Sequence, residues 1–216
     1  MNVVSFFAPR PEHPKWRDDY LPMLALLEAS CRRYGHRHIV LSDVKVDGYD
    51  TFVCELPRQL MPATIAAQAQ YLRVHDSPVL FTGVDCVLAG DPLAVLARGF
   101  DIAMTVDKFP ECPLNTGAMF VRDCGLALAY WEKALAVCGN EWGDDQKCLA
   151  RVFNAPDTPA TVVVGEGQVI DFLPMLPYHF APRNVDDVRP ATVVHFRGRR
   201  KAFMREYCSR HLGLAA

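Results

Sequence analysis

Short β-forming runs alternate with longer amphipathic segments along this chain, and this alternation limits the fold more than any other feature. The run 2–7 is rich in Val and Phe and ends in a proline-containing loop, so it predicts a buried strand. In the segment 18–34 leucines recur at helical spacing as far as Cys31, and Gly35 follows, which predicts a helix with a glycine stop. This pattern favours a layered α/β fold.

The alternation continues to the end of the chain. The strands at 162–164 and 169–173 flank a Gly-Glu-Gly turn and should form a hairpin, whereas the proline-rich stretch 174–190 predicts an irregular connection. Because no repeat or linker is visible, we expect one domain over residues 1–216. The other expected strands are 38–41, 51–54, 78–82, 101–106, 117–121 and 192–196, and the other expected helices are 64–75, 124–137 and 142–153.

The composition is that of an ordinary globular protein with one well-buried core. The 216 residues are 50% hydrophobic, and a formal net charge of −2 argues against a nucleic-acid coat or a strongly cationic membrane binder. The eight cysteines show no C-x-x-C pair or zinc-ligand spacing, and several lie in apolar runs, so we expect reduced core thiols. Without an apolar window near ~18 residues or a signal-peptide pattern, a soluble cytoplasmic protein is expected.

An acidic residue follows the most apolar of the predicted strands. The continuous apolar run 78–82 predicts a central strand, and it leads directly into Gly83, Val84 and Asp85. In open α/β sheets ligands bind at the carboxyl ends of the strands, so Asp85 is a candidate metal ligand. A single Asp in a glycine-containing loop also suits a simple turn cap.

Three later segments carry further polar signals, each with a plain structural alternative. Asn115 stands beside Gly117 at an expected strand entrance, where its amide suits sugar hydroxyls or a turn. Asp144 and Asp145 open a predicted helix, where carboxylates complement the helix dipole. The run 197–210 holds six Lys/Arg against one Glu, which fits a solvated helix face or attraction of an anionic substrate.

Near the C-terminus His195, Gly198 and Lys201 form an H-x-x-G-x-x-K pattern. An imidazole can hold a divalent cation, a glycine lets backbone approach an anion, and a lysine neutralises phosphate oxygens. These residues predict a grip on a metal and a diphosphate. The pattern alone is weak evidence, because it also occurs by chance.

Taken in this order, the motifs resemble those of GT-A type nucleotide-sugar glycosyltransferases, in particular family eight, which includes glycogenin and galactosyltransferase-like enzymes. The family's D-x-D is matched by 83–85, its Asn-x-Gly by 115–117, its Asp-Gln by 145–146 and its H-x-x-G-x-x-K by 195–201. The resemblance covers roughly 70–201. It implies a GT-A-like α/β/α sandwich with a central mixed, mostly parallel sheet.

The resemblance also implies a role for each matched residue. Asp85 and His195 would ligate Mn²⁺ or Mg²⁺ on the diphosphate of a donor, usually a UDP-sugar, and Lys201 would stabilise the leaving phosphate. Asp145 and Gln146 would act with Lys201 at the transferred sugar, with retention at its anomeric carbon. The implied donor-binding set is Phe7, Ala8, Arg10, Arg73, Gly83, Val84, Asn115, Gly117, Gly198 and Lys201.

The chain departs from the family pattern at Gly83, which stands where the first Asp of the metal motif would be. With one carboxylate fewer, a hard cation would depend more on diphosphate oxygens and water. An alternative is therefore a catalytically degraded module that binds a nucleotide sugar or a nucleic acid. Nucleotidyl transfer ranks lower, since FFAPRPEHPK is not a glycine-rich basic loop. The acceptor stays open among a glycan, a lipid headgroup and a modified nucleobase.

Overall fold

The computed structural model describes residues 1–9, 14–107 and 112–214. Its main feature is an eight-stranded sheet in the order β3-β2-β1-β4-β7-β6-β9-β8. β7 and β8 run antiparallel to the other strands, so the sheet is mixed and mostly parallel, as predicted. The strands are β1 (Asn2–Phe6), β2 (Arg37–Ser42), β3 (Thr51–Val53), β4 (Val79–Thr82), β6 (Ile102–Val106), β7 (Leu114–Val121), β8 (Ala160–Val164) and β9 (Gln168–Pro174).

A smaller three-stranded sheet lies beside the main one. It consists of β5 (Cys86–Leu88), β10 (His179–Phe180) and β11 (Val193–His195), with β11 parallel to β10 and antiparallel to β5. The sequence analysis assigned no element to 86–88, and its prediction of an irregular connection over 174–190 was wrong at β10. β10 has two residues inside a proline-rich stretch, and β5 directly follows a glycine-containing loop, so neither carries a clear strand signal of its own.

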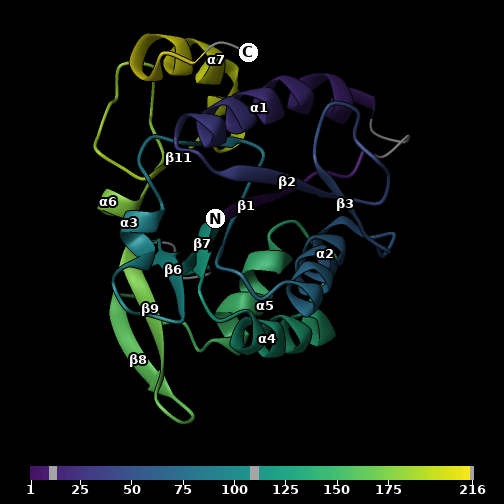
Figure 1. Ribbon diagram of the computed structural model, residues 1–216, viewed down its shortest axis with the longest axis vertical. Helices are drawn as coiled ribbons and strands as arrows, with labels where there is room; N and C mark the ends of the chain where they lie inside the picture. Colours follow the sequence, from purple (N-terminus) through teal and green to yellow (C-terminus); the bar gives the residue numbers. More distant parts are fainter. Residues whose placement is uncertain (10–13, 108–111, 215–216) are drawn as a thin grey trace.

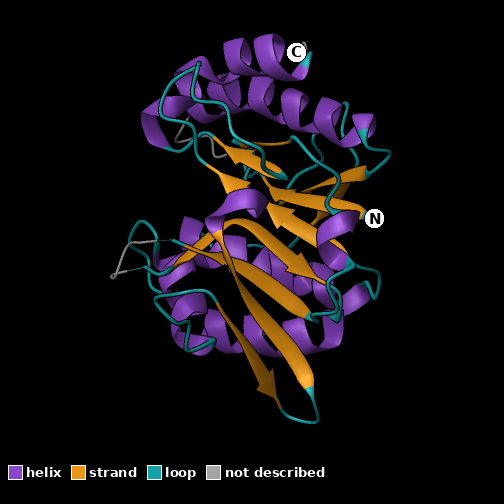
Figure 2. Ribbon diagram, turned by 90° about the vertical axis from the view of Figure 1, so that its left-hand side faces the viewer, coloured by secondary structure: helices purple, strands orange, loops and turns teal. Residues whose placement is uncertain are grey.

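Helices cover both faces of the main sheet and produce three layers (Figures 1 and 2). On one face lie α2 (Leu60–Val74), α4 (Cys124–Val137) and α5 (Asp144–Val152), and on the other lies α1 (Pro14–Arg33). The predicted α/β/α sandwich is thus confirmed. The shorter helical segments are α3 (Leu93–Leu96), α6 (Met175–Tyr178), the 3₁₀ segment Gly198–Phe203, α7 (Met204–Tyr207) and the π turn Cys208–Leu212.

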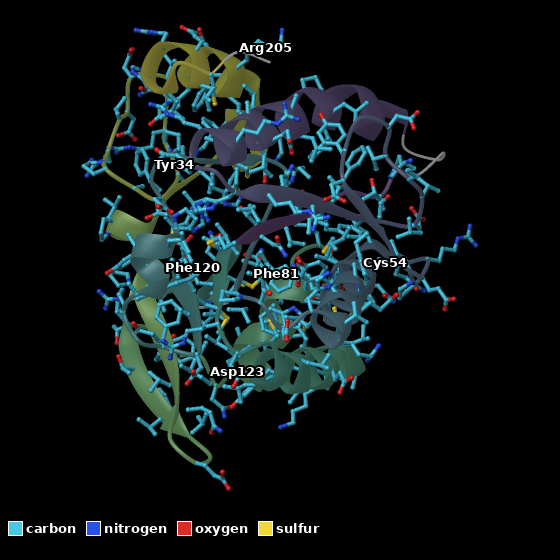
Figure 3. All side chains as sticks on the ribbon, in the orientation of Figure 1. Tyr34, Cys54, Phe81, Phe120, Asp123 and Arg205 are labelled. Atoms are coloured by element: carbon cyan, nitrogen blue, oxygen red, sulfur yellow. The ribbon has the colours of Figure 1, made fainter. Side chains whose placement is uncertain are left out.

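The two faces of the sheet bury separate apolar clusters. Phe81 on β4 and Phe120 on β7, both labelled in Figure 3, are fully buried but belong to different clusters. Phe81 packs toward α2 and α4, where its ring lies 5.9 Å from that of Trp131. Phe120 shares a cluster with Leu27 of α1. Because successive residues of a strand face opposite ways, adjoining central strands supply both cores.

Two boundaries matter for the site. β7 begins at Leu114 instead of residue 117, so Asn115 and Gly117 lie inside a strand and not at its entrance. The basic run 197–210 folds into the 3₁₀ segment, α7 and the start of the π turn, a set of short helices that the sequence analysis left undefined. Apolar periodicity is too weak over such short stretches to mark them.

All eight cysteines are free, and six of them are buried, which agrees with the expectation of core thiols. Burial raises the pKa of Cys54 to about 11 and that of Cys208 to about 12, so both stay protonated near neutral pH. Across the described part of the chain, no helix combines the length and the apolar character that crossing a bilayer requires.

The fold generates a stability prediction at Trp131. This indole is fully buried, and its N–H donates to the side-chain oxygen of Gln68 over 2.7 Å. Trp131→Phe keeps most of the apolar contact but leaves a buried amide oxygen without its donor, so we expect a loss of about 1–3 kcal/mol in unfolding free energy. Urea denaturation measures it. The double variant with Gln68→Leu should be more stable than Trp131→Phe alone, and equal or lower stability would contradict the argument.

Candidate functional site

A cavity of about 500 Å³ opens at the carboxyl ends of β1 and β4. Phe7 and Ala8 line it just after β1, and the segment Thr82–Asp85 lines it after β4. Residues of β7, the first half of α2, the start of α5 and the segment 195–201 also line it. Its volume is within the range of small-molecule sites, and its position matches the ligand-binding edge of open α/β sheets.

Pairing of β5 with β11 brings Asp85 and His195 together. His195 lies opposite Cys86 in the antiparallel register, and the Phe196 N–H donates to the Asp85 carbonyl oxygen over 2.8 Å. The Asp85 Oδ1 and His195 Nε2 atoms are then 3.3 Å apart. The Lys201 ammonium forms an ion pair with Asp85 Oδ2. The three side chains that the sequence analysis linked therefore converge at one place.

The charge of this cluster is balanced inside the protein. Side chains of Asp85 and His195 are 14% and 13% exposed. Burial acts to raise the pKa of the Asp85 carboxyl, but the charges and hydrogen bonds of His195 and Lys201 outweigh it and hold that pKa well below its usual range. Asp85 is consequently an anion, and in this structure its two oxygens contact His195 and Lys201.

A second buried histidine stands behind His195. The rings of His179 and His195 are nearly parallel, with centroids 5.2 Å apart, and His179 Nε2 lies 3.1 Å from His195 Nδ1. Burial holds the pKa of His179 well below its usual value, so its imidazole is neutral. Gly117 makes this arrangement possible, because a Cβ there would lie 2.4 Å from His195 Nδ1 and 2.9 Å from His179 Cε1.

Gly198 and Lys201 form the other side of the cluster. Gly198 begins the 3₁₀ segment with a φ of +57°, a left-handed conformation that favours glycine. The turn returns the chain toward β5, so the Lys201 ammonium reaches Asp85 and lies 5.8 Å from the centroid of the Tyr20 ring. Gly198, Lys201 and Tyr20 all line the cavity.

The residues expected at the sugar occupy two different positions. Asp145 and Gln146 line the cavity from the first turn of α5, and burial raises the pKa of the Asp145 carboxyl. Asn115 is buried behind the wall, where its side-chain oxygen accepts the Gly117 N–H over 3.0 Å and its amide nitrogen donates to Asp107 over 3.3 Å. In this structure Asn115 holds Gly117 in place instead of facing the cavity.

The remaining expected donor-binding residues divide into three groups. Arg73 lies outside the cavity, near the end of α2, where its guanidinium pairs with Glu132 of α4 over 2.7 Å. Arg10 falls outside the described residues. The residues that line the cavity as expected are Phe7, Ala8, Gly83, Val84, Gly117, Gly198 and Lys201.

Sequence reasoning missed several residues of the site. Arg197 lines the cavity and donates to Asp107 over 2.6 Å, and its place inside the H-x-x-G-x-x-K pattern was an available signal. Trp142 is 77% exposed at the cavity wall, next to the Asp-Asp-Gln start of α5. No motif marks His179, since its contact with His195 arises only when β10 pairs with β11.

The cluster has the chemistry of a hard-cation site with few protein ligands. Ligand atoms of Asp85, Cys86 and His195 lie within 4.8 Å of one another. The buried Cys86 thiol has a raised pKa and approaches the Gly117 carbonyl oxygen at 3.5 Å, so it is a poor ligand. A carboxylate oxygen and an imidazole nitrogen remain, and this pair suits Mn²⁺ or Mg²⁺ if a ligand supplies further oxygens.

Comparison with known proteins identifies the class of fold. No family model and no curated protein sequence matches this chain. A glycosyltransferase involved in the glycosylation of the major capsid of PBCV-1 superposes with a TM-score of 0.60 at 14% identity, covering 95% of this chain and 98% of that one. The bifunctional glycosyltransferase WbbM gives 0.61 at 12%, covering 97% and 50%.

A third structure, the galactosyltransferase LgtC in complex with donor and acceptor sugar analogs, gives a TM-score of 0.54 at 16% identity and covers 99% of this chain and 93% of LgtC. At such low identity the likeness establishes the fold. The chain thus has the GT-A-like fold that the motif resemblance predicted.

The approach of the two histidines to Gly117 generates a prediction. Gly117→Ala would push a methyl group into buried imidazole atoms, so we expect a loss of about 1–3 kcal/mol in unfolding free energy from overpacking. It should also separate His195 from Asp85. Chemical denaturation measures the first effect. Gly125→Ala in α4 is the matched control, because its nearest neighbour would be 3.4 Å away; equal stability of the two variants would argue against the tight contact.

Proposed function

We propose that this chain is a glycosyltransferase that moves a sugar from a nucleoside diphosphate sugar, a UDP-sugar in the simplest case, to an acceptor with the help of Mn²⁺ or Mg²⁺. The observation that carries the proposal is the meeting of Asp85, His195 and Lys201 in the cavity at the carboxyl ends of β1 and β4. The glycosyltransferase fold supports the same activity. We take residues 1–216 as one catalytic unit.

The cavity offers a separate environment for each part of the donor. The apolar wall at Phe7 and Ala8 suits the nucleobase, and the basic turn with Gly198 and Lys201 suits the diphosphate. Asp145 and Gln146 then face the sugar, because they line the wall on α5. LgtC was crystallised with donor and acceptor sugar analogs, which supports a cavity of this fold that holds both.

Bond breakage at the anomeric carbon leaves negative charge on the departing nucleoside diphosphate. A divalent ion held by Asp85 and His195 supplies Lewis-acid stabilisation of that charge when bound. Lys201 adds a fixed positive charge at the same place. Arg197, four residues earlier in the sequence, also lines the cavity. We propose retention at the anomeric carbon from the family resemblance, with Asp145 and Gln146 positioning the sugar.

A binding module without turnover is the second candidate. Gly83 favours it, because the metal motif has lost one carboxylate, and both oxygens of Asp85 already contact side chains of the protein, one of His195 and one of Lys201. Slow hydrolysis of the donor distinguishes the two, since a transferase releases nucleoside diphosphate without an acceptor and a module does not.

Transferase activity should depend on the two proposed metal ligands, Asp85 and His195. Asp85→Asn and His195→Gln remove the anion and the imidazole from the cavity, so we expect each to lower Mn²⁺-dependent release of UDP from UDP-sugars by roughly 10²-fold or more. Product release is measured on a panel of UDP-sugars, with EDTA as the metal-free arm. Asp186→Asn is the control, because Asp186 is exposed and pairs with Arg210 outside the cavity. Full activity of both site variants would contradict the proposal.

Binding of the metal ion should be coupled to binding of the donor's nucleoside diphosphate. Because Gly83 provides no carboxylate, the cation depends on diphosphate oxygens, so Mn²⁺ should bind roughly 5- to 150-fold more tightly with UDP present than without it. Electron paramagnetic resonance of free Mn²⁺ measures both affinities. UMP, which lacks the second phosphate, serves as the matched ligand control. Equal Mn²⁺ affinity in all three conditions would show that the protein alone forms the metal site.

A further inference from the structure

His179 is a fully buried titratable residue to which the proposed chemistry assigns no role. It lies on β10, whose parallel pairing with β11 sets its ring against that of His195. Both of its ring nitrogens are engaged: Nε2 is 3.1 Å from His195 Nδ1, and Nδ1 is 3.0 Å from the Thr105 hydroxyl. A polar ring this deep in a protein is costly unless it is fully hydrogen-bonded, and this one is.

The contacts form a directional chain when His195 offers Nε2 to a cation. In that tautomer the Nδ1–H of His195 donates to His179 Nε2, and the Nδ1–H of His179 donates to the Thr105 oxygen. The Thr105 hydroxyl then donates to the Asn115 carbonyl oxygen at 3.4 Å. Each hydrogen then has an acceptor, so these contacts accommodate the tautomer in which His195 Nε2 is free to ligate.

The same series of hydrogen bonds also reaches Gly117, the glycine next to the two rings. Asn115, which receives the Thr105 hydroxyl, also accepts the Gly117 N–H through its side-chain oxygen over 3.0 Å. Gly117 in turn leaves the space that both imidazoles occupy. This network runs through β6, β7 and β10. It contacts the Nδ1 side of His195, opposite the Nε2 atom that faces Asp85.

We propose that His179 is a positioning residue for the cation site: it holds the ring of His195 so that Nε2 faces Asp85, and it accepts the His195 Nδ1–H when Nε2 ligates a cation. This inference rests on the proposed function, because it assigns a metal-ligand role to His195. A hydrogen-bond partner behind a ligating histidine commonly strengthens metal affinity by about 10- to 100-fold, and His179 occupies that place.

Mn²⁺ binding in the presence of UDP tests the inference without reference to turnover. His179→Phe keeps a ring of similar shape but removes both nitrogens, so Mn²⁺ affinity should fall by roughly 10- to 100-fold. His179→Gln, whose amide can replace the Nε2 contact, should regain much of that loss. Binding of UDP without metal is the control, because a merely structural defect would weaken it too, whereas loss of orientation at His195 leaves it unchanged.

Thr105→Val provides a second variant in case His179→Phe does not fold, which far-UV circular dichroism would reveal. It has the same shape as the native residue, removes one link of the chain, and should lower Mn²⁺ affinity by a smaller factor. Unchanged Mn²⁺ affinity in the folded variants, or no Mn²⁺ binding by the native protein, would overturn the inference. If the protein turns over the donor but the His179 variants bind Mn²⁺ as tightly as the native protein, the inference is wrong and the transferase proposal stands. If Mn²⁺ binding depends on His179 but no UDP-sugar is turned over, only the transferase proposal is wrong.

Discussion

The three-residue pairing of β5 with β11 is the interaction on which the site depends. The two strands come from distant parts of the chain, and their antiparallel register sets His195 opposite Cys86 and hence beside Asp85. The backbone hydrogen bond from Phe196 to Asp85 continues the ladder into the cavity. A shift of one residue would turn His195 to the opposite face of the strand, so register determines whether the carboxylate and imidazole meet.

Much of the main sheet and its helices could be predicted from the sequence, because long apolar runs and helical periods mark them. The helix at 124–137 was placed to the residue, and the buried strands were placed within a few residues at each end. β5 and β10 escaped prediction because β5 directly follows a glycine-containing loop and β10 lies in a proline-rich stretch, and both become strands by pairing with β11. The same limitation hid His179, whose position is a property of the smaller sheet.

At the site, motif order located the cluster correctly but could not assign every side chain. Asp85, His195 and Lys201 were expected together and are in contact. Asn115 was expected to face a sugar, yet it is buried because β7 begins earlier than its sequence indicated and turns that amide toward Gly117 and Asp107. Arg73 points to Glu132 outside the cavity, since it lies at the far end of α2 from the residues that line the wall. Spacing along a chain cannot tell which face of an element a side chain occupies.

The turn that starts at Gly198 attaches the Lys201 ammonium to the same strand that supplies the imidazole. The imidazole and the ammonium therefore belong to one continuous segment of the chain, which follows the connection 181–191. We expect a change of one residue between His195 and Lys201 to separate the imidazole from the ammonium. We therefore expect the number of residues between His195 and Lys201 to matter more to the site than the length of the connection before β11.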